Sequence, residues 1–253
     1  MIATSGLSCP ETLAARTRRL VPLRRVVGNA VIQPALQTHP RSRGPEARGG
    51  IFELSIWTDL RRSGRASALE RLSGAAIDVG ADAVVSVRLT QRRLRHLEAF
   101  EVVAEGTAVR GLAPDRVAPM LTSLGASELV ALSETGYEPL GLLFETAVWA
   151  VVPGQATVEA YRPALGRLNF EHPDFTAGLN EIRRGVLARM RTRAHDDPRC
   201  AGIVAVELGL RREDDERAGS ALVVSVDAFG TPVRLVRDAR TATTTTLEVG
   251  GTA

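Results

Sequence analysis

The sequence contains the same pattern twice, with the two copies about 117 residues apart. Residues 7–31 align with residues 124–148 without a gap. Seven residues of the first copy are identical to the aligned residues of the second: Leu7, Glu11, Ala14, Pro22, Leu23, Ala30 and Val31. Later segments keep the same order, because residues 84–89 match 203–208 and residues 106–110 match 230–234. This spacing is that of a domain, since solenoid units are only about 20 to 50 residues long. The sequence therefore predicts two copies of one domain, each with its own core.

The duplication divides the chain into residues 1–117, residues 118–237 and a C-terminal tail, residues 238–253. The tail consists mostly of Thr, Ala and Gly, so we expect it to be disordered. Leu247 and Val249 form a small apolar group after the threonines. A docking peptide for an unidentified protein partner is therefore the alternative interpretation of the tail.

Each copy predicts the same order of elements. The order is a short amphipathic helix (residues 8–17 and 126–135), a strand (23–32 and 140–152), a long loop with three prolines (33–50 and 153–174), a long helix and two closing strands. We therefore predict an α+β fold of two β-α-β-β repeats, each a three-stranded antiparallel sheet with a long helix on one face. Such a unit leaves sheet edges open, so we expect it to complete itself by oligomerising.

Local signals give further details of these elements. Apolar residues recur every three or four positions over residues 57–79 and 175–190, which is typical of amphipathic helices. Asp174 is predicted to cap the second long helix, and Ser127 the short helix before it. Period-two alternation in the first closing strand places on one face Val85, Val87 and Leu89.

The charge is distributed unevenly between the two copies. All 32 basic residues are arginine. Residues 1–117 carry 18 arginines against 11 acidic residues, a net charge of +7, whereas residues 118–253 carry 14 against 18, a net charge of −4. This asymmetry predicts faces of opposite sign that stack copy on copy.

Composition excludes several classes of protein. The two cysteines, Cys9 and Cys200, lie at non-equivalent positions, which argues against a disulfide framework and a closed thiolate zinc site. No apolar run has the length of a membrane span. The segment at the start of the chain is too short and too polar to be the core of a signal peptide. We therefore expect a cytoplasmic protein.

The densest basic cluster in the sequence consists of Arg16, Arg18, Arg19, Arg24 and Arg25. Aromatic residues make up only 4% of the chain, and no nucleic-acid-binding motif is present. A solvated face or a subunit contact therefore explains the cluster better than nucleic-acid binding.

The run Val79-Gly-Ala-Asp-Ala-Val-Val-Ser-Val-Arg88, followed by a strand that ends in Gly106-Thr-Ala-Val-Arg110, resembles the YbjQ-like family, also called heavy-metal-binding domains. Tyr137-Glu-Pro-Leu-Gly-Leu-Leu-Phe144 resembles the opening strand of that family. The resemblance covers about residues 4–111 and 122–235. It implies a dodecin-like β-α-β-β fold, rings of five subunits and, in some members, tandem copies of the domain.

The chain departs from this family where metal binding is concerned. Some members carry a cysteine in the first strand, where this chain has Leu23 and Leu140. The triplet Gly80-Ala81-Asp82 of the first copy is replaced in the second by Arg199-Cys200-Ala201. A metal site must therefore be argued from other residues.

The best candidate for a metal site is residues 195–200, which place an imidazole, carboxylates and a thiol close together. Zinc or copper accepts such ligands, but the close pairs of Cys or His that are usual in such sites are missing, so a solvated turn is the alternative. His172 is a further candidate, at a subunit boundary, and the alternative is that it is a loop residue beside the helix cap Asp174. The candidate ligands are therefore His172, His195, Asp197 and Cys200.

The sequence offers no catalytic residue. It has no Gly-x-Ser-x-Gly elbow, no cysteine beside a histidine base, and no phosphate-binding or dinucleotide-binding glycine motif. We therefore expect a non-enzymatic, ring-forming and pentameric scaffold or binding protein that associates with itself. The alternative is a metal- or small-ligand-binding sensor, with zinc or copper as its cofactor and its sites at subunit boundaries.

Overall fold

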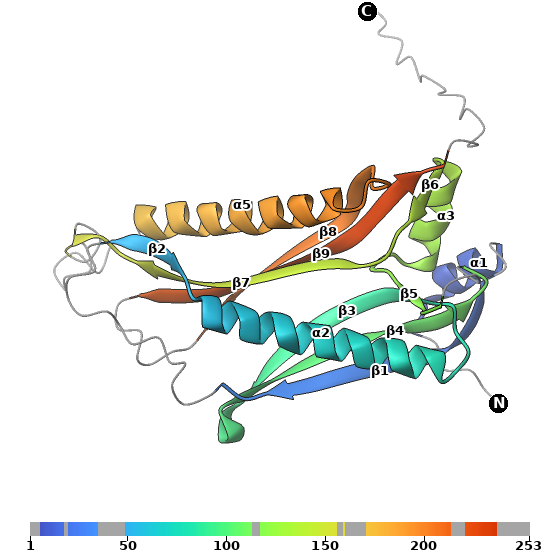
Figure 1. Ribbon diagram of the computed structural model, residues 1–253, viewed down its shortest axis with the longest axis horizontal. Coiled ribbons are helices and arrows are strands. Elements are labelled where there is room, and N and C mark those ends of the chain that lie inside the picture. The colour runs from blue at the N-terminus through green and yellow to red at the C-terminus, as the bar shows by residue number, and fades with distance from the viewer. Residues whose placement is uncertain are drawn as a thin grey trace, which may run out of the picture.

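The computed structural model describes residues 6–17, 20–34, 49–112, 117–155, 159, 171–213 and 221–236, without the side chains of Cys9 and Arg95. Its fold is α+β, as the repeated pattern predicts, and each half of the chain supplies one long helix and one principal sheet (Figure 1). The predicted tail lies outside the described residues, as do most residues of the two predicted loops. The division of the chain at residue 117 stays a prediction.

The first half contributes α1 (Cys9–Thr17), β1 (Val21–Ile32), β2 (Gly50–Glu53), α2 (Ser55–Ile77), β3 (Ala83–Leu94), a 3-10 helix (Arg95–Leu97) and β4 (Ala99–Arg110). The strands β1, β4 and β3 are antiparallel neighbours, as predicted for a three-stranded unit. Helix α2 lies across one face of this sheet (Figure 1). The core between them contains Val26, Ala68, Leu72, Val84 and Val102.

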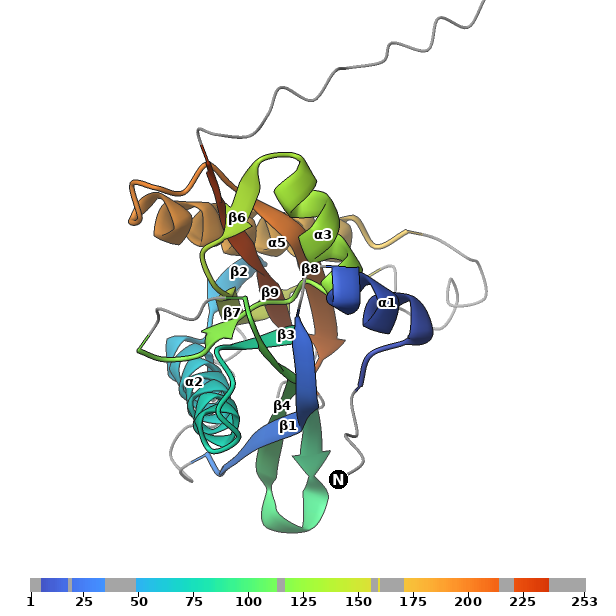
Figure 2. The same ribbon diagram turned by 90° about the vertical axis from the view of Figure 1, so that its right-hand side faces the viewer.

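The second half contributes β5 (Met120–Leu121), α3 (Ala126–Glu134), β6 (Tyr137–Pro139), β7 (Leu143–Val152), α5 (Pro173–His195), β8 (Gly202–Arg212) and β9 (Leu222–Leu235). Strands β7 and β8 pair antiparallel with opposite sides of β9. Helix α5 covers one face of this sheet, over a core that contains Ala147, Ile182, Val186, Met190 and Val226. At one end of the molecule α1 and α3 lie side by side (Figure 2).

The strands of the two halves pair in the same register. Ala30 of β1 lies opposite Val102 of β4, and the matching residues Ala147 and Val226 lie opposite each other in the second half. The equivalence seen in the sequence is therefore repeated in the hydrogen-bonded sheets, which is consistent with a two-repeat arrangement. We call the two halves the first and the second repeat.

Each repeat also contains a β-bulge at an equivalent position. Ser86 in β3 and Ala205 in β8 have positive φ angles of 54° and 49°, and the strand register shifts at both points. The prediction that Val85 shares a face with Val87 is therefore wrong. The bulge turns Val85 toward the cluster around Met120, while Val87 packs in the core under α2.

Both predicted helix caps are also wrong. Helix α5 begins two residues earlier than predicted, with His172 at its N-cap and Pro173 in the first helical position, which proline favours. The Asp174 carboxylate instead accepts a hydrogen bond of 2.8 Å from Gly154 N. In α3, Gly125 is the N-cap residue and its N–H donates to the Glu128 carboxylate at 2.7 Å, so Ser127 lies inside the helix.

Two short strands extend the sheets beyond the predicted three strands. Strand β2, from the first repeat, pairs antiparallel with β7 of the second repeat. Strand β5, from the second repeat, pairs in parallel with β3 of the first repeat. Strand β6 also pairs with β9 in the second sheet, so the sheets have four and five strands, and each repeat supplies one strand to the other's sheet.

Candidate functional site

The contact between the two repeats is built around α2, which buries two faces. One face packs on its own sheet, and the other meets the second repeat through polar side chains. Thr58, Arg61 and Arg65 on that face are only 2%, 2% and 3% exposed. Sheet β7–β9 is therefore covered on both sides, by α5 on one and by α2 on the other (Figure 1).

Three arginines of α2 form ion pairs with carboxylates of the second repeat. The pairs are Arg61 with Glu213 at 2.7 Å, Arg62 with Glu145 at 2.8 Å and Arg65 with Asp227 at 2.5 Å. All three run from the basic repeat to the acidic repeat. The charge asymmetry of the sequence thus corresponds, within a single chain, to a contact between faces of opposite sign.

Arg61 is the most deeply buried of these cations. Its guanidinium carbon lies 3.5 Å from the centre of the Phe100 ring. Burial lowers the pKa of Arg61 to about 10, and the charge of Glu213 opposes this shift. Removing a cation from water is costly unless it is paired, so this contact holds only while the carboxylate is in place.

One ion pair between the repeats has the opposite polarity. The Glu53 carboxylate, at the end of β2, accepts a hydrogen bond of 2.7 Å from Arg189 of α5 and another of 3.2 Å from Thr58. The bond from Arg189 holds the pKa of Glu53 below its ordinary value. This pair fixes the short strand β2 against the second repeat.

Backbone groups of β7 complete the same contact. Leu54 N donates to Val148 O at 2.8 Å, and Val148 N donates to the Thr58 hydroxyl at 2.9 Å. Val148 lies just beyond the residues of β7 that pair with β2, and backbone groups at such an open edge normally bond to water or to another chain. Here the start of α2 satisfies both backbone groups of Val148, which is fully buried.

The β-bulge of β3 supplies a second set of backbone bonds. Ser86 N donates to Leu124 O at 2.9 Å, and Val87 N donates to Thr122 O at 3.0 Å. The Thr122 hydroxyl lies 2.9 Å from the hydroxyl of Thr231 in β9. The bulge thus directs two N–H groups of the first repeat toward the segment that leads into the second.

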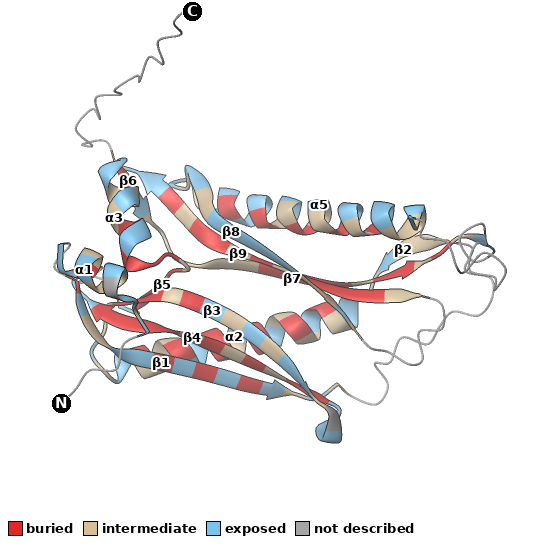
Figure 3. Ribbon diagram, turned by 180° about the vertical axis from the view of Figure 1, so that it is seen from behind, coloured by how far each residue is buried: buried red, intermediate tan, exposed pale blue. Residues whose placement is uncertain are grey.

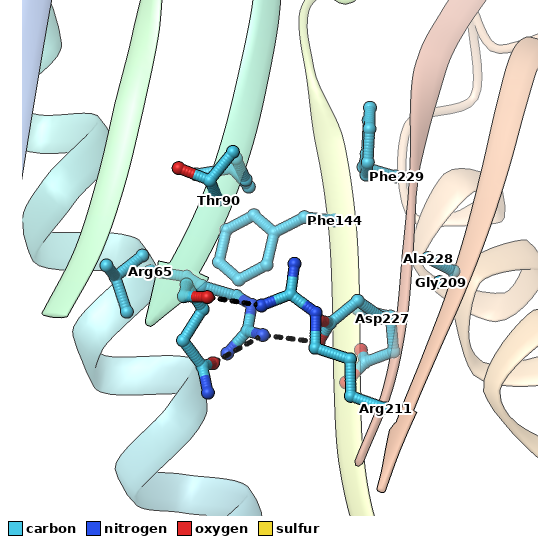
Figure 4. Close-up of a pocket in the computed structure, with 12 residues that line it drawn as sticks. Arg65, Thr90, Phe144, Gly209, Arg211, Asp227, Ala228 and Phe229 are labelled. Carbon is cyan, nitrogen blue, oxygen red and sulfur yellow. Dashed lines mark hydrogen bonds and ion pairs between the residues drawn. The ribbon is translucent and has the colours of Figure 1, made fainter. Parts of the chain in front are cut away.

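A small pocket lies in this contact (Figure 4). Its lining includes Arg65, Leu89, Gln91, Phe144, Arg211 and Asp227. Arg211 donates to Gln91 O at 2.7 Å, and Arg65 donates to the side-chain oxygen of Gln91 at 3.1 Å. Both guanidinium groups therefore already bind protein oxygens, and the lining residues include no histidine or cysteine. The pocket has a charged and an aromatic wall, and its carboxylates, Glu145 and Asp227, form ion pairs with Arg62 and Arg65.

The predicted metal ligands lie at opposite ends of α5. His172 is the N-cap residue of the helix and His195 its last residue, so a rise of about 1.5 Å per residue separates them by roughly 34 Å. Asp197 and Cys200 follow His195, but Arg199 donates to both carboxylate oxygens of Asp197, at 2.9 and 2.7 Å. Those bonds lower the pKa of Asp197 to about 2.

Among the described residues, no three His, Cys, Asp or Glu side chains are grouped so that they could hold a metal ion. The zinc or copper site stays a prediction.

The described residues also contain no helix that is long and apolar enough to cross a membrane. In the basic cluster of the sequence, Arg25 forms an ion pair with Glu105 on the neighbouring strand.

The triplet that distinguishes the repeats has a structural role in the first. The Asp82 carboxylate accepts hydrogen bonds from Gly111 N at 2.6 Å and Leu112 N at 3.2 Å. Gly80 has a φ of +68°, and its carbonyl oxygen accepts from Arg110 at 3.0 Å. These bonds join the residues before β3 to the residues at the end of β4. The triplet therefore stabilises the chain where the two strands meet.

Residues 45–111 match the YbjQ-like family model. The description of that family is "putative heavy-metal-binding", and the match spans α2, β3 and β4 of the first repeat. A UPF0145 protein of Natronomonas pharaonis is 43% identical over 58 residues, which is 23% of this chain and 55% of that protein. The resemblance noted in the sequence is confirmed for this YbjQ-like segment.

A second relative aligns with nearly the whole chain. It is an encapsulin nanocompartment protein of Mycobacterium tuberculosis, 27% identical over 250 residues, which is 95% of this chain and 88% of that protein. No solved structure matches the chain. The YbjQ-like segment, residues 45–111, is therefore part of a much longer stretch of this chain that aligns with this relative.

Sequence reasoning missed the residues that join the repeats. Arg61, Arg65 and Thr58 lie outside the apolar stripe of α2, on a polar side of the helix. In a sequence, such a polar side is typical of a surface that faces solvent. The only signal for their partners was the difference in net charge between the copies. The contact between the two repeats is therefore the candidate functional site.

Proposed function

We propose that this protein is a non-enzymatic scaffold or binding protein that assembles into a ring of five chains and acts in an encapsulin nanocompartment. The observation that carries the proposal is the head-to-tail contact between the repeats, in which α2 of one covers the β7–β9 sheet of the other. A contact between two different surfaces generates rings when its rotation closes.

The names of the relatives and the state of the pocket also support this proposal. The relative that aligns with 95% of the chain is named as an encapsulin nanocompartment protein, and neither relative bears the name of an enzyme. The inter-repeat pocket supplies hydrogen-bond donors that are already engaged, which suits a structural contact better than catalysis. A cytoplasmic location fits this role and stays a prediction.

The mass of the purified protein in solution tests self-assembly. Size-exclusion chromatography with light scattering should give five times the chain mass of 27.1 kDa at micromolar concentration. Another multiple would correct the number of chains but keep the assembly. A single species of 27.1 kDa would overturn the proposal.

Association with a nanocompartment needs a separate experiment. The full chain is co-expressed with an encapsulin shell protein, and the shells are purified by sedimentation. We expect the chain to sediment with the shells and to stay in the supernatant without them. A chain that ends at residue 237 tests whether the predicted tail carries the association. Absence of the full chain from the shells would remove the nanocompartment from the proposal.

A further inference from the structure

Equivalent residues of the two repeats differ sharply in exposure. Val148 of β7 is fully buried, whereas its equivalent in β1, Val31, is 53% exposed. Val87 of β3 is 1% exposed, whereas its equivalent in β8, Val206, is 44% exposed. Val148 lies where the start of α2 covers β7, and Val87 lies in the first-repeat core against which Leu142 and Phe144 of the second repeat pack. The exposed members lie on β1 and β8, two strands that show exposed stretches in Figure 3.

The two long helices show the same difference. Helix α2 buries Thr58, Arg61 and Arg65 in addition to its core stripe, whereas α5 buries a single stripe. Thr176 of α5 is the equivalent of Thr58, is also a threonine and is exposed. The second repeat therefore presents a surface equivalent to the one that the first repeat uses for joining, and the part of the chain that the structure describes leaves it open at Thr176.

We propose that a second copy of this chain joins here, with α5 and β8 of one copy covering β1 of the next copy as α2 and β3 cover β7. This inference rests on the proposed self-assembly and names its surfaces. In the new contact, the Thr176 hydroxyl accepts a hydrogen bond from Val31 N, as Thr58 does from Val148 N at 2.9 Å.

Apolar contacts fit the same arrangement. Phe144 of β7 packs against the core of the first repeat, which contains Val87. The equivalent of Phe144 in β1 is Val27, which is 50% exposed. A repeat of the internal contact therefore brings Val27 of one copy against Val206 of the next and buries both.

The charges decide which repeats can meet. Buried Arg65 pairs with Asp227, and the half-exposed Arg62 pairs with Glu145, but the equivalent positions of the first repeat hold Val103 and Gly28. An α2 docked on another first repeat would therefore bury Arg65 without a carboxylate, which disfavours that pairing.

Helix α5 carries neutral residues where α2 has two of its arginines. Leu179 and Asn180 take the places of Arg61 and Arg62. Arg183, in the place of Arg65, would meet Glu101 and Glu105 on the outer face of β4. Second repeats therefore join first repeats and the order alternates, so a closed ring holds an even number of repeats, ten in a ring of five chains.

Two variants block the two surfaces separately. Val206→Glu places a charge on the surface of the second repeat, and Val27→Glu places one on the surface of the first. Each variant alone should give a species of 27.1 kDa, and the two mixed in equal amounts should give a dimer of twice that mass. A contact between identical surfaces would give no such rescue. The dimer also shows that both variants are folded.

The control is Leu97→Glu, at an equally exposed position on the 3-10 helix, which should keep the wild-type mass. Thr176→Val, which removes one hydrogen bond without adding charge, should raise the concentration at half-dissociation roughly fivefold. The inference is overturned if both charged variants keep the wild-type mass, or if their mixture stays monomeric. A wild-type monomer would instead overturn the proposed function as well.

Discussion

Arg65 and Asp227 form an ion pair at 2.5 Å between the two repeats, and the Arg65 side chain is only 4% exposed. Thr146 also donates to the Asp227 carboxylate, at 2.7 Å. The pair is thus enclosed by side chains of both repeats. A buried pair of this kind adds little net stability over a well-packed apolar pair, but losing one member is costly.

We therefore expect Asp227→Ala to lower the free energy of unfolding by about 3–5 kcal/mol, because it leaves a buried guanidinium without its carboxylate. Replacing both members, by Arg65→Met and Asp227→Leu, should recover most of this loss. Urea unfolding followed by circular dichroism measures both effects. The control is Glu138→Ala, which removes an exposed pair with Arg234 and should cost less than about 1 kcal/mol. Equal losses in the two single variants would contradict the prediction.

Gly28 sets how closely α2 approaches β1. A Cβ at this position would lie 2.2 Å from Ala68 O and 2.3 Å from Leu72 N, so the helix would have to move away from the sheet. We expect Gly28→Ala to destabilise the fold by about 3 kcal/mol. Gly74→Ala, in the same helix with open space around the new methyl group, should stabilise it by about 0.5–1 kcal/mol. Thermal unfolding compares the two variants, and a change of the same sign in both would count against this role of Gly28.

Ala205 adopts a φ of 49°, in the left-handed region that a side chain disfavours. Glycine adopts such a φ without this penalty. Ala205→Gly should therefore raise the free energy of unfolding by up to about 1 kcal/mol, and with it the midpoint temperature of thermal unfolding. Ala201→Gly, at a position without a positive φ, should lower the midpoint instead. A lower midpoint for Ala205→Gly would show that the bulge stores no strain.

Glu53 gives the contact between the repeats a dependence on pH. The hydrogen bond from Arg189 lowers the pKa of Glu53 below its ordinary 4.5. Because the folded value is the lower one, this stabilisation is complete above the unfolded pKa and is lost as the pH falls through the folded pKa. Glu53→Gln should therefore destabilise the protein most at neutral pH, and the difference from wild type should shrink below pH 4.5. Urea unfolding at a series of pH values, with exposed Glu70→Gln as the control, measures this; a constant difference would refute it.

Titration with zinc and with copper tests the metal site predicted around His195 and Cys200. Arg199 already occupies both carboxylate oxygens of Asp197, so we expect binding no tighter than high micromolar by calorimetry. Arg199→Ala frees that carboxylate and should tighten any binding that exists. Tight binding by the wild type that Cys200→Ser abolishes would restore the metal-sensing alternative.

The parts of the fold that depend on local pattern were predictable from the sequence. The strands β1 and β7 follow from runs of β-branched and apolar residues, and α2 and α5 from a period of three to four. The predicted caps failed because Pro173 and Gly125 take positions that the neighbouring Asp174 and Ser127 were expected to define.

The parts that depend on the other repeat were not predictable. Strands β2 and β5 have four and two residues, too few for any periodicity, and they form only by pairing across the repeats. Arg61 and Arg65 are spaced as on any solvent-facing side of a helix, and only the second repeat makes their positions interior. The unequal charge of the copies indicated that such a contact exists, but not which residues make it.

The exchange of β2 and β5 has a consequence for the integrity of the molecule. Each of these strands is hydrogen-bonded into the sheet of the repeat to which it does not belong in sequence. A protease that cuts between residues 112 and 117 would therefore produce two fragments on a denaturing gel but a single particle in solution. We likewise expect two separately expressed polypeptides, one for each half, to reassemble through these exchanged strands.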